Sequence, residues 1–169
     1  MTAQGAIEIE RKFIVEKPSE ELLSECEGYT KSVITQIYLS SQKNETRRVR
    51  KRVYNDRTVY IETKKTRIDP MSSNEIEREI TEEEYNRLLL EKREGTAPVN
   101  KIRYTVDYHS HTFEIDVYPE WKRSCIMEVE LLSRDESVDY PPFIKIVREV
   151  TGNKAYSNAS MAKAFPSEQ

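Results

Sequence analysis

The sequence feature that most constrains the fold is an alternation of apolar and charged residues with a period of two. Successive side chains of a β-strand point to opposite faces of a sheet, so each alternating segment is predicted to be a strand with one apolar and one charged face. The alternation recurs in eight segments, at residues 6–15, 33–41, 46–54, 58–65, 75–80, 100–108, 111–118 and 125–132. We therefore expect a mainly β (α+β) protein.

The charged faces separate their signs from strand to strand. Acidic faces are predicted in the first, fifth, seventh and eighth segments, and basic faces in the third and sixth. The simplest interpretation is that these faces point to water, as in an antiparallel sheet with one buried side. Solvent faces usually mix Ser, Thr, Asn, Lys and Glu, whereas nearly every position here is ionic. The segregation favours a closed structure with the charged face inside.

Eight strands are enough to close a barrel, which removes the sheet edges. Helical patterns at 19–27, 81–94, 141–150 and 157–164 would cover the outer apolar face, and Thr81 with Glu84 forms a capping box at the start of the second. We expect one domain over residues 1–169, an eight-stranded antiparallel closed barrel with helices packed outside. An interior with more carboxylates than cations requires a divalent metal on its acidic side and a polyanion on its basic side.

Composition excludes several classes of function. The net charge is -3, from 30 acidic and 27 basic residues, so no bulk positive field favours nucleic acid or an anionic membrane. No apolar run could span a bilayer and the N-terminus does not resemble a signal peptide, so a cytoplasmic location is expected. Cys26 and Cys125 are predicted to be free thiols, and His109 and His111 to be exposed at a hairpin tip rather than metal ligands.

The most informative local pattern is Glu8, Glu10 and Lys12, which share one face of the first strand. Several hard carboxylate oxygens favour Mg²⁺ or Mn²⁺, and these ions usually keep open positions for phosphate oxygens and water. Lys12 could then meet a phosphate directly. The pattern predicts a metal and phosphate site.

The segment Gly5–Val15 resembles the opening of the CYTH domain, or triphosphate tunnel metalloenzyme, superfamily, whose name-giving motif is ExExK. The resemblance covers almost the whole chain and is closest to the short bacterial members. Its later blocks are the second strand at 35–40, the RxR strand at 48–50, the strand lysine at Lys64, the acidic strand at 75–80, KxRY at 101–104, an acidic strand at 113–117, ExE at 128–130 and the tail at 149–158.

The resemblance implies a role for each matching residue. The phosphate chain would be bound by Lys12, Arg48, Arg50, Lys64, Lys101 and Arg103. The main divalent ion would be held by Glu8, Glu10, Glu128 and Glu130. Asp116, with Glu114 and Glu77, is the candidate set for a second metal or for orienting the attacking water, so the catalytic candidates are Lys12, Glu77, Glu114 and Asp116.

The activity that these features predict is metal-dependent hydrolysis of a small-molecule triphosphate, with inorganic tripolyphosphate as the expected substrate and a homodimer left open. The alternatives are a class IV adenylate cyclase, a thiamine triphosphatase and a polyphosphate-binding module without turnover. Three positions depart from the family pattern: Asn100 before the KxRY lysine, and Asn153 and Ala155 in the tail. These departures are expected to affect the fit of the substrate rather than the binding of its phosphate groups.

Overall fold

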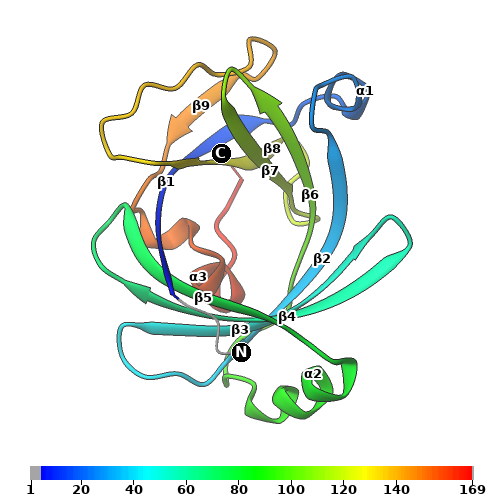
Figure 1. Ribbon diagram of the computed structural model, residues 1–169, viewed down its shortest axis with the longest axis vertical. Helices are drawn as coiled ribbons and strands as arrows, with labels where there is room; N and C mark the ends of the chain where they lie inside the picture. Colours follow the sequence, from blue (N-terminus) through cyan, green and yellow to red (C-terminus); the bar gives the residue numbers. More distant parts are fainter. Residues whose placement is uncertain (1–4, 169) are drawn as a thin grey trace.

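The eight predicted strands form a closed antiparallel barrel in the computed structural model, which describes residues 5–168 (Figure 1). The ends of the predicted domain, residues 1–4 and 169, lie outside the described residues. Around the barrel the order is β5-β4-β3-β2-β6-β7-β8-β1, and β1 also pairs with β5. The strands are β1 (Ala6–Glu16), β2 (Thr30–Leu39), β3 (Glu45–Tyr54), β4 (Arg57–Arg67), β5 (Ser72–Ile80), β6 (Val99–Tyr108), β7 (His111–Val117) and β8 (Ser124–Leu131).

A further strand, β9 (Ile146–Glu149), replaces part of the helix predicted over 141–150, so that prediction was wrong. β1 pairs with β5 only from Ala6 to Ile9, because Ser72, the partner of Ile9, is the first residue of β5. β9 pairs with β1 further along, at Phe13–Val15. Backbone groups of β1 that β5 does not reach therefore find partners on β9, which outweighs the helical tendency of the segment.

The helices are shorter than predicted. They are α1 (Glu20–Ser24), α2 (Glu82–Leu88) with the 3-10 turn η1 (Leu89–Glu91), the 3-10 turn η2 (Lys154–Tyr156) and α3 (Asn158–Lys163). The capping box is confirmed, because Thr81 Oγ1 accepts from the Glu84 backbone N–H at 3.1 Å and Glu84 Oε1 accepts from the Thr81 N–H at 3.3 Å. Among the described residues, no helix has the length and apolar character needed to cross a membrane.

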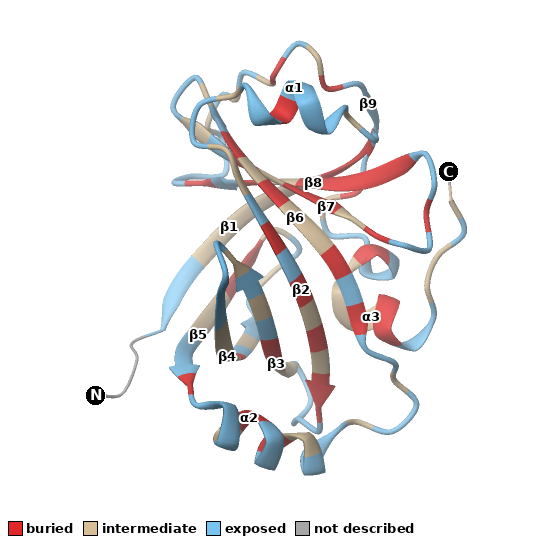
Figure 2. Ribbon diagram, turned by 90° about the vertical axis from the view of Figure 1, so that its right-hand side faces the viewer, coloured by how far each residue is buried: buried red, intermediate tan, exposed pale blue. Residues whose placement is uncertain are grey.

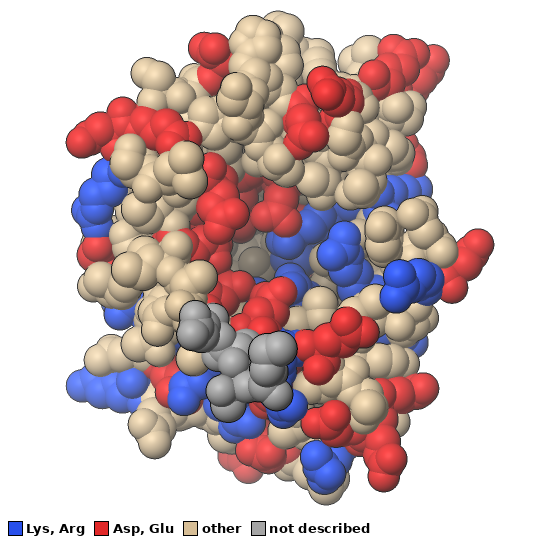
Figure 3. Space-filling model, in the orientation of Figure 1, with Lys and Arg blue, Asp and Glu red and all other residues tan. Residues whose placement is uncertain are grey.

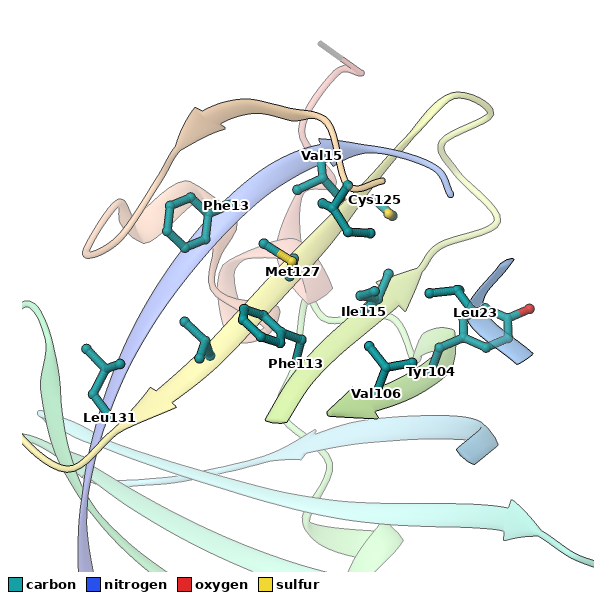
Figure 4. Packing of buried hydrophobic residues seen from close by; sticks show 12 residues of the cluster. Phe13, Val15, Leu23, Tyr104, Val106, Phe113, Ile115, Cys125, Met127 and Leu131 are labelled. Atoms are coloured by element: carbon teal, nitrogen blue, oxygen red, sulfur yellow. The ribbon is translucent and has the colours of Figure 1, made fainter. Parts of the chain in front are cut away.

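The main core lies outside the barrel wall, over β1, β6, β7 and β8. Figure 4 shows Phe13, Phe113 and Met127 packed together there, with Leu23 of α1 at one edge. A smaller cluster joins Val49 to Tyr85 of α2. Burial alternates along β2 (Figure 2), as the period-two pattern predicts. On β1, β6, β7 and β8 the apolar face points outward and is covered, which leaves the opposite face to line the interior. On β2 the buried face is instead the inward one, because it includes Tyr38, which lines the cavity.

Helix α3 does not follow the expected external arrangement. Its Met161 packs with Tyr118, Ile126 and Ile14, and the last two share the strand faces of Glu128 and Lys12. Figure 1 shows α3 within the outline of the ring of strands, and Figure 2 shows it toward one end of the barrel. The C-terminal segment therefore fills part of the barrel interior.

Candidate active site in the barrel interior

A cavity of about 360 Å³ occupies the barrel interior and is almost entirely charged. Its acidic lining residues are Glu8, Glu10, Glu75, Glu77, Glu114, Glu128 and Glu130. Its basic lining residues are Lys12, Arg48, Arg50, Arg52, Lys65, Arg67, Lys101 and Arg103. Seven carboxylates thus face eight cations, so the expected excess of carboxylates was wrong. Figure 3 shows the hollow between a red and a blue side.

The order of the strands separates the two charges into walls. The lining carboxylates come from β7, β8, β1 and β5, which are consecutive neighbours around the barrel. The lining cations, apart from Lys12, come from β4, β3 and β6, and only β2 intervenes. We name these the acidic wall and the basic wall. Strands far apart in the sequence therefore create one face for cations and one for anions.

Buried carboxylates repel one another on the acidic wall. Burial, together with a hydrogen bond to Glu75, raises the pKa of Glu8 to about 10. Burial and the negative charge of Glu128 also raise the pKa of Glu10. Burial alone would raise the pKa of Glu75, but the hydrogen bond with Glu8 and the charge of Arg48 lower it to about 2. The protein alone thus keeps a proton among these carboxylates at neutral pH.

Two lysines lie close to carboxylates of the acidic wall and offset part of its negative charge. Lys12 Nζ lies 3.4 Å from Glu128 Oε1, and Lys65 Nζ lies 3.6 Å from Glu75 Oε2. Among the described residues, no three His, Cys, Asp or Glu side chains are arranged as a finished metal site. The donor chemistry nevertheless fits a hard divalent ion, because clustered carboxylate oxygens hold a proton that such an ion would displace.

The basic wall offers unused hydrogen-bond donors. The Nε atoms of Arg48 and Arg50 are buried and have no hydrogen-bond partner among the described residues. Burial and the nearby charges of Arg48 and Arg103 lower the pKa of Arg50 to about 10, and its Nη2 lies 3.5 Å from Glu77 Oε2. Cations crowded in this way are stabilised by a bound anion, which also satisfies their free N–H groups.

Asp116 lies behind the basic wall instead of lining the cavity. Its side chain is 1% exposed, and its Oδ2 lies 2.8 Å from Lys101 Nζ. Its two oxygens also accept from Arg103 Nε at 2.7 Å and Nη2 at 2.9 Å. Burial would raise its pKa, but Arg103 and Lys101 hold that pKa well below its usual range. Asp116 is therefore paired with both cations, and its side chain is not among the described residues that line the cavity.

Lys64 is the other site residue that the structure places elsewhere. Its side chain is 51% exposed on the outside of β4 and lies 3.2 Å from Glu45. Lys65 lines the cavity instead. The pairing of β4 with β5 explains the difference, because Thr63 and Lys65 lie opposite Glu77 and Glu75. The inward face of β4 is thus the odd-numbered one.

The remaining predicted site residues all line the cavity: Glu8, Glu10, Lys12, Arg48, Arg50, Glu77, Lys101, Arg103, Glu114, Glu128 and Glu130. Arg103 Nη1 lies 2.6 Å from Glu114 Oε2, which links two of them across the walls. The residues predicted from the sequence did not include Arg52, Lys65 and Arg67. Alternation gave no signal for Lys65 and Arg67, because they share the odd parity of the apolar residues Val59 and Ile61, which the pattern assigns to the outer face.

The C-terminal segment completes the lining with Ser157, Asn158 and Ala159. Lys12 Nζ donates to the carbonyl oxygen of Tyr156 at 3.2 Å, and Asn158 Oδ1 accepts from Tyr118 Oη at 2.8 Å. The family departures lie outside this lining. Asn100 Oδ1 accepts from Thr35 at 3.0 Å, and Asn153 Oδ1 accepts from the Ala155 N–H at 3.1 Å.

The two histidines and two cysteines that were not predicted to take part in the site lie outside the cavity lining. His109 pairs with Asp139 and His111 with Glu136, both away from the cavity. Cys26 and Cys125 are free thiols, as predicted, and burial raises the pKa of Cys125 to about 12. The side chain of His109 is 60% exposed, as predicted, but that of His111 is 11% exposed, so its predicted exposure was wrong.

The fold is shared with solved structures. The inorganic triphosphatase NE1496 is 27% identical, covers 95% of this chain and 97% of its own, and has a TM-score of 0.58. The protein PH1012 from Pyrococcus horikoshii is 20% identical over 76% of this chain and 80% of its own, with a TM-score of 0.55. HpAC1 from Hippeastrum, for which a dominant triphosphatase activity is described, is 16% identical over 73% of this chain and 80% of its own, with a TM-score of 0.50.

No protein-family model matches the chain, and no curated protein does so at a significant level. The structural matches confirm the resemblance to the triphosphate tunnel superfamily that the motifs indicate.

Proposed function

We propose that this chain is a metal-dependent triphosphatase that hydrolyses inorganic tripolyphosphate to diphosphate and phosphate inside the barrel. The observation that carries the proposal is the pair of opposed walls in one cavity, with the buried Nε atoms of Arg48 and Arg50 left without hydrogen-bond partners among the described residues. The similarity to the inorganic triphosphatase NE1496 supports it.

The basic wall binds the phosphate chain. Arg48, Arg50, Lys65, Lys101 and Arg103 present guanidinium and ammonium groups from three strands, so successive phosphates meet cations along the cavity. Asp116 fixes the orientation of Lys101 and Arg103 before substrate arrives. A cation held in place in this way stabilises the charge of the transferring phosphoryl group without reorganising during the reaction.

The acidic wall holds the divalent ion. Glu8, Glu10, Glu128 and Glu130 would bind Mg²⁺ or Mn²⁺, with Glu75 added from the structure. The bound ion supplies Lewis-acid neutralisation of phosphate oxygens. Glu114, whose pKa is raised by burial, and Glu77 remain candidates to accept a proton from the attacking water and to orient it. Lys12 lies between the walls and offers an ammonium to substrate.

The cavity favours a substrate without an organic group. Among the described residues that line it, Tyr38 is the one aromatic side chain, and Ala159 is the one apolar aliphatic side chain. An adenine or thiazolium ring would need apolar or stacking surface there. The cavity therefore suits tripolyphosphate better than ATP or thiamine triphosphate.

A substrate panel tests the proposal, using tripolyphosphate, ATP and thiamine triphosphate with each of Mg²⁺ and Mn²⁺. We expect phosphate release from tripolyphosphate to be fastest. Cyclic AMP as the main product would favour the cyclase alternative, and tight binding of every triphosphate without any product would favour a binding module.

Two arginines of β3 provide a matched pair of variants. Arg50→Ala removes a cavity cation, whereas Arg47→Ala removes one that pairs outside with Glu62 and Glu91. We expect at least a tenfold loss of kcat/KM for Arg50→Ala, because it removes a charged hydrogen-bond donor worth about 1.5–3 kcal/mol, and near-normal activity for Arg47→Ala. Equal activity of both variants, or unchanged hydrolysis in Glu8→Ala and Lys12→Ala, would disprove the proposed site.

A further inference from the structure

A second pocket, of about 510 Å³, lies outside the barrel where β2, β6 and the β7–β8 connection meet. Figure 2 shows β2 and β6 running side by side toward this region. We name it the outer pocket. Its apolar lining includes Val33, Ile102, Val117, Pro119 and Trp121. A concave, mainly apolar site of this volume is typical of small-molecule binding.

Several polar atoms around the outer pocket are already used by the fold, including the Oδ1 of Asn100, which accepts from Thr35 at 3.0 Å. Trp121 Nε1 donates to the carbonyl oxygen of Pro166 at 2.9 Å, and Tyr118 Oη donates to Asn158 at 2.8 Å. Lys101 lines both cavities, but its ammonium lies 2.8 Å from Asp116. The part of Lys101 left for the outer pocket is its hydrocarbon stem. The floor thus offers apolar surface rather than hydrogen bonds.

The charged groups of the outer pocket have one sign. Lys17 and Lys122 line it and are exposed. Among the described residues, no Asp or Glu lines it, although acidic residues outnumber basic ones in the chain. A ligand whose charged end lies near these lysines gains from an anionic group.

We propose that the outer pocket is a second binding site, which takes an amphipathic anion: an aromatic or aliphatic body carrying one carboxylate or sulfonate. The apolar body would cover the hydrocarbon of Val33, Ile102 and Trp121, and the anionic group would lie near Lys17 and Lys122. Such a ligand does not suit the barrel interior, whose lining is charged nearly throughout, because its body would displace water from ions there.

The test uses 8-anilinonaphthalene-1-sulfonate, which has an aromatic body and one sulfonate and fluoresces in apolar surroundings. The intact protein is titrated without metal or triphosphate, so the result does not depend on catalysis. We expect saturable binding to one site. Saturating tripolyphosphate is then added to occupy the barrel interior, and we expect most of the fluorescence to remain.

Variants of residues in and outside the lining show where the probe binds. Val33→Glu puts a carboxylate into the apolar lining and is expected to weaken binding at least tenfold. Val147→Glu is the matched control, because Val147 is 49% exposed on β9, compared with 51% for Val33 on β2, and does not line the pocket. Lys122→Glu is expected to weaken binding severalfold at low salt and less at high salt.

Three results would overturn the proposal. The first is equal binding by the wild type, Val33→Glu and Val147→Glu. The second is complete displacement of the probe by tripolyphosphate, which would place it in the barrel interior. The third is a dimer that binds no probe and becomes monomeric in Val33→Glu, which would make the pocket an interface between copies of the chain. Circular dichroism of each variant shows whether the barrel is still folded.

Discussion

Adjacent lysines on β4 give the sharpest test of the barrel, because the structure assigns them opposite sides of the wall. Lys65 lines the cavity, whereas Lys64 is 51% exposed and pairs with Glu45 on the outside. Lys65→Met and Lys64→Met each remove one ammonium and keep most of the hydrocarbon stem. The two variants have the same composition and net charge, so only position distinguishes them.

The expected magnitudes follow from the surroundings. Lys65 Nζ lies 3.6 Å from Glu75 and near the path of the phosphate chain. A hydrogen bond to a charged group contributes about 1.5–3 kcal/mol, which corresponds to a loss of about 10- to 150-fold in kcat/KM. An exposed ion pair is worth about 0–1 kcal/mol to stability and touches no substrate, so Lys64→Met should keep kcat/KM within about threefold of the wild type.

The assay is phosphate release from tripolyphosphate at several substrate concentrations, with thermal melts of both variants as a folding control. The family resemblance assigns the phosphate contact to Lys64, so the two readings of β4 predict opposite results. A larger loss in Lys64→Met than in Lys65→Met, or equal losses in both, would refute the inward orientation of the odd-numbered face and the wall built on it.

Three other perturbations address separate parts of the molecule. Asp116→Asn leaves Lys101 and Arg103 buried with a weaker partner, so we expect a lower melting temperature and a fall in kcat; unchanged kcat in a folded variant would contradict the positioning role. The pKa of Glu8 is raised from 4.5 to about 10, so a divalent ion must displace its proton, and metal affinity should rise with pH from about 6 to 9. Calorimetry in buffers of different ionisation enthalpy should show that metal binding releases a proton. A metal affinity that does not depend on pH would contradict this prediction. By the same shift, the stability gained from protonated Glu8 is complete below pH 4.5 and is lost as pH rises through 10, so the metal-free protein should melt at lower temperature toward alkaline pH. Thr81→Ala removes the cap of α2 and should cost about 1 kcal/mol of stability in urea unfolding without changing kcat/KM, since α2 lies outside the cavity.

Most of the fold follows from local pattern. The eight strand predictions correspond to β1–β8 because alternation and short polar turns act over a few residues. The helix predicted over 141–150 failed because pairing with β1 is a long-range effect that no local pattern contains. The shortened α1 and α2 show the usual difficulty of placing element ends.

The candidate site was likewise predicted in part from local pattern, and the rest of it depends on tertiary contacts. Alternation and sign placed Glu8, Glu10, Arg48, Arg50 and most of their partners on the correct face, and the structure brings them into one cavity. The sequence alone could not place Asp116, since its depth depends on the two cations that surround it in the folded barrel.

The sequence by itself determined that the charged face of most strands would carry mainly one sign, because that information lies in residues close together in the chain. Only the tertiary structure decided that acidic strands are mutual neighbours and that Lys65 rather than Lys64 faces inward. The stretch from Thr63 to Arg67 is polar on both faces, so hydrophobicity gives no parity there. The register between β4 and β5, which sets Lys65 opposite Glu75, fixes it, because shifting a strand by one residue exchanges its two faces.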